Sequence, residues 1–181
     1  MSFAKSLRRR IHRLPLAASG LMLGVAGEGT LLSSYGMVKD IFGAIAFIIL
    51  TLLLLKIVFD GKDVINGLRD ASPAGSAFTF PMAIVILSVY VLPLQPIIAK
   101  CMFWIAILIH CFGILLFTKK FLIPFAIENI FPSTFVVYVG TVIISVVAPA
   151  FHKIVIGQVF FIFGFISYLI LLPIVLYRAL T

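Results

Sequence analysis

Long apolar runs alternate with short polar connections along the whole chain. Six such runs stand out, at about residues 15–36, 41–59, 78–97, 101–118, 132–150 and 155–177. A hydrocarbon core about 30 Å thick requires about 20 apolar residues in a helix, and a backbone in lipid must satisfy its own hydrogen bonds. The pattern therefore predicts an all-α integral membrane protein. Its membrane domain, 15–178, has six transmembrane helices arranged as three helical hairpins.

Two connections are longer than a hairpin turn. In the connection 60–77, the first half predicts a short interfacial helix, which Pro73 and Gly75 are expected to end. In the connection 119–133, Pro124 and the charge of Glu128 argue against a continuous span.

The six spans differ in character, and the difference follows their order. The second, fourth and sixth are almost entirely bulky and apolar, whereas the first, third and fifth carry the small residues, the hydroxyls and most of the prolines. Bulky apolar helices suit lipid, and helices with small and polar residues suit close packing or a water-filled path. We therefore expect the odd-numbered spans to be innermost and the even-numbered spans to shield them.

Small and polar residues in the odd spans recur at helical spacing. In the first span Gly20, Gly24 and Gly27 fall at i, i+4 and i+7 on one stripe. At about 100° per residue, Glu28 lies roughly 80° from the centre of that stripe. The far side of this helix holds Met22, Val25 and Leu32. Glu28 therefore borders the small-residue face and need not point at lipid.

The third and fifth spans carry comparable stripes. Pro81, Ser88 and Gln95 repeat every seven residues, and the fifth span places Thr134, Tyr138, Thr141 and Ser145 at i, i+4, i+7 and i+11. The alternative is helix packing, through a GxxxG pair and through hydroxyls that bond their own backbone. Three stripes confined to alternate spans favour a shared polar pathway. The candidate lining residues are Ser19, Gly20, Gly24, Gly27, Glu28, Pro81, Ser88, Tyr138, Thr141 and Ser145.

Composition and charge fit this interpretation. The 181 residues are 63% hydrophobic and 11% charged, whereas about a quarter of a soluble domain is charged. The net charge of +8 does not indicate nucleic-acid binding, because the basic residues lie at span ends, where they fix orientation. Eleven basic residues fall on the side of the N-terminus and three, Lys39, Lys100 and Lys153, on the other. We expect a multi-pass cell-membrane protein with both termini cytoplasmic and a retained basic segment, 1–14.

No enzyme constellation is present in the sequence. It contains no Walker loop, no HExxH and no pair of carboxylates within the spans. Cys101 and Cys111 would lie about 15 Å apart on one helix, too far for a disulfide, and neither has a metal-ligand spacing. His110, inside the fourth span, is expected to pack and bond to a neighbour. We predict neither enzymatic activity nor a cofactor or metal.

Several local strings together resemble one family. The first span, LPLAASGLMLGVAGEGTLL (14–32), is similar to the first span of the tellurite-resistance/dicarboxylate transporter family, which includes plant slow-type anion channels and fungal malate carriers. TFPMAI (79–84), FPSTFVVYVGTVIISVVAPAF (131–151) and GQVFFIFGFISYLILLPIVLYR (157–178) resemble its third, fifth and sixth spans. The order and spacing of these strings cover nearly the whole chain.

The resemblance implies a fold of ten spans in five hairpins, in which odd spans line a central pore. It also implies a trimer and anion substrates: chloride, nitrate, C4-dicarboxylates such as malate, or oxyanions such as tellurite. The sequence departs from the family in two ways. It stops at Thr181 after six spans, which suggests a fragment or truncated product and leaves out the family's pore-blocking phenylalanine. Glu28 also stands where the family usually has an apolar residue.

The leading functional prediction is transport of small anions through a central pore lined by odd spans. The alternative is a non-conducting membrane subunit or truncated product of such a transporter. For Glu28 three hypotheses stay open. It is neutral or paired with a cation from another span at the edge of the pathway, it couples protons to transport, or it is a tolerated polar residue near a water-filled vestibule.

Overall fold

The computed structural model describes residues 14–124 and 129–180 of the chain. These ranges are built from helices and contain no strand. The predicted basic segment, 1–14, lies outside the described residues except for Leu14, as do Glu128 and Thr181. Five of the described helical stretches are long and apolar enough to cross a membrane.

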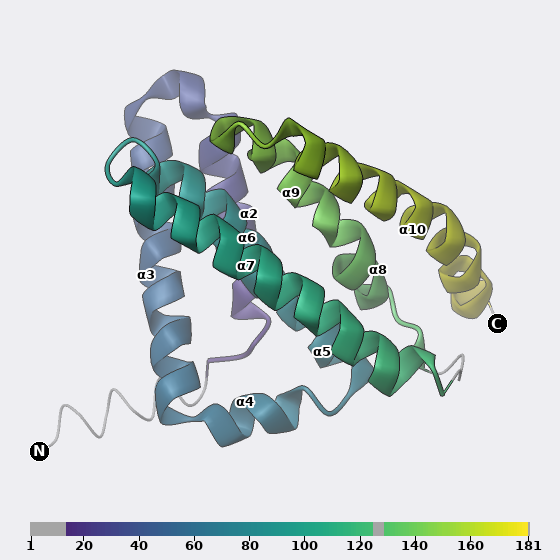
Figure 1. Ribbon diagram of the computed structural model, residues 1–181. Coiled ribbons are helices and arrows are strands. Elements are labelled where there is room, and N and C mark those ends of the chain that lie inside the picture. The colour runs from purple at the N-terminus through teal and green to yellow at the C-terminus, as the bar shows by residue number, and fades with distance from the viewer. Residues whose placement is uncertain (1–13, 125–128, 181) are drawn as a thin grey trace, which may run out of the picture.

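The first helical hairpin consists of α2 (Ala18–Leu31) and α3 (Met37–Phe59), joined by the short 3-10 helix Ser33–Tyr35 (Figure 1). Gly36 follows with φ +43°, a backbone conformation that glycine adopts without steric cost. With 14 residues, α2 is shorter than the predicted span 15–36 and measures about 21 Å at 1.5 Å per residue. It is therefore the one predicted span that is not among the five membrane-crossing stretches of the described chain.

The second hairpin is preceded by a short helix, α4 (Gly61–Gly67), in the half of the connection where the sequence predicted one. The hairpin itself runs through α5 (Ala71–Ala77) and α6 (Thr79–Val91) and returns as α7 (Pro96–Phe117), which ends in a π-helical turn, Thr118–Leu122. The stretch 71–91 forms a single 21-residue candidate span, so the expected span 78–97 begins and ends earlier than predicted.

The prediction that Pro73 and Gly75 end a helix is wrong, because both lie inside α5. Pro73 stands in the first turn, where a backbone N–H has no helical partner to lose. Gly75 fits there because Ser133 lies against it: a Cβ at Gly75 would come 2.9 Å from the Ser133 carbonyl oxygen. The interruption between α5 and α6 falls at Phe78, three residues before Pro81, whose missing N–H leaves the Ala77 carbonyl without its helical partner.

The third hairpin is less regular on its first side. It runs through α8 (Ser133–Tyr138), a 3-10 turn (Val139–Thr141), α9 (Val142–Val147) and a second 3-10 turn (Ala148–Phe151) before α10 (Ile154–Leu180). The fifth span is thus not one continuous α-helix. A 3-10 turn advances 120° per residue instead of 100°, so the predicted stripe from Thr134 to Ser145 does not keep a single face.

The packing agrees with the expected alternation at the third and fifth spans, whereas only four of the 14 residues of α2, in the first span, are buried. α2 lies against α3 and α6, α6 against α7, and α9 against α10. Within the membrane-crossing stretches, 56% of the window in 71–91 and 44% of that in 133–151 is buried. The corresponding shares are 28% for α3, 28% for the stretch that contains α7, and 11% for α10. The third and fifth spans are therefore more enclosed than the second, fourth and sixth.

Candidate functional site

The helix α2 has a packed face and an open face. Its buried residues, Ser19, Met22, Ala26 and Gly29, follow one another at intervals of three or four and face α3 and α6. Met22 is completely buried, so the far side of the predicted glycine stripe is the side that packs into the core. The glycine stripe and Glu28 consequently lie toward the face that the described helices leave uncovered.

The open face of α2 is formed by Ala17, Leu21, Gly24, Glu28 and Leu31, all of them exposed. A Cβ added at Gly24 or Gly27 would meet no atom within 4 Å. At Gly20 the nearest atom would be Thr79 Oγ1 at 4.0 Å, an ordinary contact. In the described chain, the GxxxG pair Gly20 and Gly24 therefore does not mark a close helix contact.

The glycines that make the close helix contact are Gly29 and Gly43, which belong to no stripe that the sequence analysis used. A Cβ at Gly29 would clash with the Tyr90 hydroxyl and lie 2.7 Å from Phe42 Cβ. A Cβ at Gly43 would lie 2.6 Å from Tyr90 Cδ1. The sequence signal that could have located this contact is the small pair Ala26 and Gly29, which shares the packed side of α2.

Hydrogen bonds fasten the packed face of α2 to α6. Ser19 Oγ and Thr79 Oγ1 are 2.7 Å apart, and Tyr90 Oη donates to the Ala26 carbonyl oxygen at 2.8 Å. Thr30 Oγ1 also donates to that carbonyl, at 3.0 Å. Ser19 therefore connects the first and third spans, as part of the contact between them rather than on the open face.

The other hydroxyl candidates mainly bond their own helices. Ser88 and Thr141 are fully buried, and they donate to the carbonyls of Val85 and Tyr138, three residues earlier in each case. Ser145 is half-buried and bonds its own backbone in the same way, at 2.6 Å. Pro81 and Tyr138 are buried as well. These five residues lie away from the open face of α2, and their part in a pore stays a prediction.

A second polar contact connects the fourth and fifth spans at the point where α8 gives way to the 3-10 turn. His110 is 1% exposed, and its Nε2 lies 3.0 Å from the carbonyl oxygen of Val137. Tyr138 Oη and Thr118 Oγ1 are 2.7 Å apart. The expectation that His110 packs and bonds to a neighbour is confirmed, and its partner is the carbonyl of Val137, one residue before α8 ends.

Glu28 has no hydrogen bond or ion pair to any described residue. Its side chain is exposed on the open face, between the positions of Gly24 and Leu31. Lys39, the basic residue near the start of α3, instead lies over the Tyr90 ring, 5.3 Å from its centroid. The hypothesis that a cation from another span pairs with Glu28 therefore finds no partner in the ranges 14–124 and 129–180.

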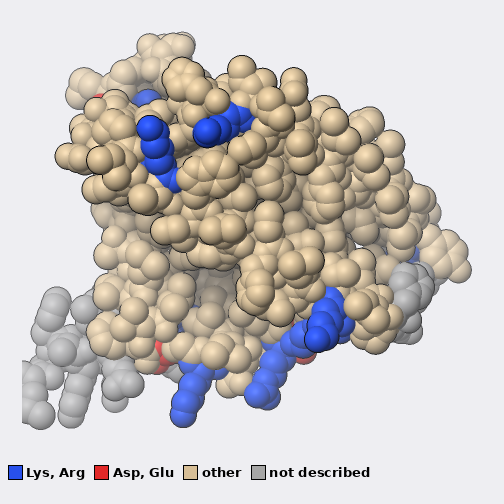
Figure 2. Space-filling model, in the orientation of Figure 1, with Lys and Arg blue, Asp and Glu red and all other residues tan. Residues whose placement is uncertain are grey.

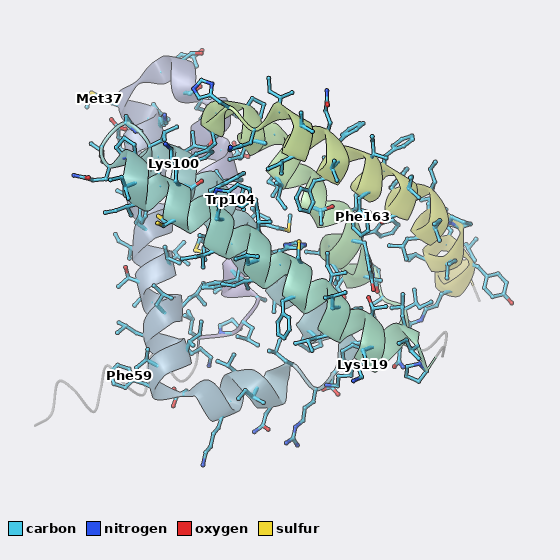
Figure 3. All side chains as sticks on the ribbon, viewed as in Figure 1. Met37, Phe59, Lys100, Trp104, Lys119 and Phe163 are labelled. Atoms are coloured by element: carbon cyan, nitrogen blue, oxygen red, sulfur yellow. The ribbon has the colours of Figure 1, made fainter. Side chains whose placement is uncertain are left out.

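Charged side chains gather at the two ends of the molecule (Figure 2). Lys100 and Lys119 mark the opposite ends of the fourth span (Figure 3). Cys101 and Cys111 are both free thiols. Among the residues that the structure describes, no group of three or more His, Cys, Asp or Glu could hold a metal ion.

The comparisons with known proteins bear on nearly the whole chain. The model of the SLAC1 family, described as voltage-dependent anion channel, matches residues 13–181. A search of curated proteins gives no match. The matched region includes all the described helices and therefore both faces of α2.

Proposed function

Since the chain belongs to the voltage-dependent anion channel family, we propose that it moves small anions across the membrane along the open face of α2. Family membership makes it a multi-pass membrane protein of an anion channel and transporter family, which is not a family of enzymes. The route, the substrates and the role of Glu28 belong to the proposal.

One observation carries this route: α2 exposes glycines and a carboxylate on the face that no described helix covers. A carboxylate that faces hydrocarbon is costly, so such a face requires water or protein opposite it. Gly24 and Gly27 leave the space beside the helix free, because a Cβ at either position would touch nothing. A water-filled path beside α2 satisfies both features.

The buried polar residues would then form the wall that supports this path. Ser19 holds α2 against α6, and Ser88 is fully enclosed within α6. In this proposal Ser19, Pro81, Ser88, Tyr138 and Thr141 position the lining helices, whereas Gly20, Gly24, Gly27 and Glu28 border the path itself. Ser145, which is half-buried and lies against Gly157 of α10, belongs to the same supporting wall.

Glu28 would act on anions through its charge. A carboxylate about 4 Å from a permeating anion repels it by about 4 kcal/mol at an effective dielectric constant of 20, and water in the path reduces that figure. An ionised Glu28 therefore opposes anion passage. This favours a gating role, with proton coupling as the alternative.

The remaining parts of the proposal come from the family resemblance and from charge. The candidate substrates are chloride, nitrate, C4-dicarboxylates such as malate, and oxyanions such as tellurite. From the resemblance we propose a trimer in the cell membrane. We propose that both termini are cytoplasmic, because most basic residues fall on that side.

A second function is a membrane subunit that does not conduct by itself. The open face of α2 favours it, since a pathway needs a second wall and no described helix supplies one opposite Gly24 and Glu28. Anion flux into proteoliposomes separates the two functions. The purified chain should be tested with malate, chloride and nitrate, with and without a pH gradient.

Two variants and their controls test the route. Gly24→Trp fills the open face and should lower flux at least tenfold, whereas Ile45→Trp, on an exposed position of α3, should not. Glu28→Gln should raise flux about tenfold, whereas Asp40→Asn, at an exposed carboxylate outside α2, should leave flux unchanged. If Glu28 couples protons, Glu28→Gln should instead abolish uptake driven by a pH gradient and spare exchange.

Absence of flux in the wild-type chain would favour the non-conducting subunit. Flux that resists Gly24→Trp would place the route elsewhere in the molecule.

A further inference from the structure

A cavity lies at the opposite side of α2 from the open face, near the end of the molecule that carries α4. Its volume is about 370 Å³, within the range of ligand-binding sites. Apolar side chains from α3, α4 and α7 line most of it, among them Ile57, Val64, Ile109 and Leu116. The polar groups in its lining are Ser19, Lys56 and Lys120.

The cavity opens between α3 and α7, two helices that belong to stretches long and apolar enough to cross a membrane. Ile57, Ile109 and Leu116 line it and are also 42%, 46% and 52% exposed, on the outer sides of α3 and α7. The two helices diverge toward α4 in Figure 1, and Phe59 and Lys119 mark their separated ends in Figure 3. An apolar molecule in the bilayer can therefore enter between α3 and α7 without crossing water.

The charge available at the mouth of the cavity is that of Lys120. The ammonium of the buried Lys56 is 2.8 Å from the carboxylate of Asp63, which is half exposed, so Lys56 already has an anionic partner. Lys120 is exposed, and its Nζ donates to the Leu68 carbonyl at 3.0 Å and lies 4.7 Å from the centroid of the Phe121 ring. Those contacts hold the ammonium at the rim without a carboxylate among the described residues.

An apolar cavity open to the bilayer, with an ordered ammonium at its polar end, matches an anionic phospholipid. We propose that this cavity binds such a lipid, with acyl carbons against Ile109 and Leu116 and the phosphate against Lys120. The positive-inside count places Lys56, Lys62, Arg69, Lys119 and Lys120 on the cytoplasmic side. Anionic lipids are concentrated in that leaflet, and basic pockets between helices bind their headgroups.

Native mass spectrometry of the full chain, released from detergent with added lipid, tests this site. The probes are phosphatidylglycerol, phosphatidylcholine of the same acyl chains, and inorganic phosphate. The wild-type chain should bind phosphatidylglycerol about fivefold more tightly than phosphatidylcholine, since one basic residue near an anionic headgroup contributes about that factor. Inorganic phosphate should not displace the lipid.

Two matched pairs of variants assign the contacts. Lys120→Gln should remove the fivefold preference, whereas Lys119→Gln, an exposed neighbour outside the cavity lining, should keep it. Leu116→Trp fills the cavity and should weaken retention of either lipid about tenfold, whereas Leu115→Trp, which is 67% exposed and outside the lining, should change retention less than twofold.

Equal effects within either pair, no preference between the two lipids, or no retained lipid would overturn the proposal. Displacement by inorganic phosphate would overturn it in favour of a soluble anion at Lys120. Lipid binding is measured here without flux, so these outcomes are independent of the transport proposal.

Discussion

The neighbouring helices α2 and α6 have similar residues and different surroundings. Both belong to odd spans, and both carry small residues and hydroxyls that interrupt an apolar run. Eight of the 13 residues of α6 are buried, against four of the 14 residues of α2. The sequence pattern treats the two helices alike, but the structure encloses one of them and leaves one face of the other open.

The difference assigns distinct roles to their polar groups. Ser88 in α6 is fully buried and bonds its own helix, and Tyr90 bonds across to α2. Glu28 in α2 bonds no described residue. Tyr90 therefore belongs to the contact between the two helices and Ser88 is satisfied within its own helix, whereas Glu28 requires a partner or solvent outside the described helices.

The largest expected effect separates two glycines of the same helix. Gly29→Ala should destabilise the protein by about 2 kcal/mol, because the added methyl group meets Phe42 Cβ at 2.7 Å and the hydrogen-bonded Tyr90. Gly24→Ala should be neutral or stabilising by up to about 1 kcal/mol, since its methyl group meets no atom and alanine favours a helix. Thermal unfolding in detergent, followed by circular dichroism, measures both. Equal losses at the two positions would contradict the distinction between the faces.

Removal of the Tyr90 hydroxyl should have the next largest effect. Tyr90→Phe removes the 2.8 Å bond to the Ala26 carbonyl and should cost about 1 kcal/mol. The loss stays small because Thr30 also donates to that carbonyl. Tyr35→Phe, on a residue that is 70% exposed, is the matched control and should leave the unfolding temperature unchanged. An unfolding temperature that Tyr90→Phe leaves unchanged would mean that the hydroxyl of Tyr90 does not hold α2 on α6.

The sequence predicted the helical membrane fold because hydrophobic length alone requires it, as α3, α7 and α10 illustrate. It also predicted the more enclosed third and fifth spans, since small and polar residues avoid lipid. It did not predict α5, because the acceptance of Pro73 depends on its place in the first turn, and that of Gly75 on Ser133, a residue 58 positions away.

The same limit applies to the candidate site. The periodicity placed Gly24 and Glu28 near one face of α2, and the structure exposes both. A helical wheel assumes a regular helix, so it could not foresee that Val139–Thr141 interrupts the stripe of the fifth span. A helical wheel also omits neighbouring helices. It therefore could not distinguish Gly29 and Gly43, which lie against Tyr90, from Gly24 and Gly27, which lie against no other residue.

A small effect is expected at Ser88, and it sharpens the contrast with Glu28. Ser88→Ala should change the free energy of unfolding by less than about 0.5 kcal/mol, because its hydroxyl bonds only the Val85 carbonyl of its own helix, at 2.6 Å. Anion flux should stay within twofold of the wild-type rate, since the side chain is completely buried. A tenfold change in flux would show that Ser88 borders the anion path. In that case α6 as well as α2 would line the path.

The smallest expected effect on stability is at Glu28. Its effect on flux, in contrast, should be the largest among the substitutions that do not enlarge a side chain. Glu28→Gln keeps the size of the side chain and removes only the charge, and the residue is exposed with no described partner, so the free energy of unfolding should move by less than about 0.3 kcal/mol. A charge that faces an anion path should still alter flux about tenfold, which corresponds to about 1.4 kcal/mol. Unfolding and flux should be measured on the same preparation. Together they show whether Glu28 faces an anion path or makes a contact with another protein group. A stability loss above about 1 kcal/mol would mean that Glu28 binds a protein partner, and unchanged flux would mean that the open face of α2 does not carry the anion.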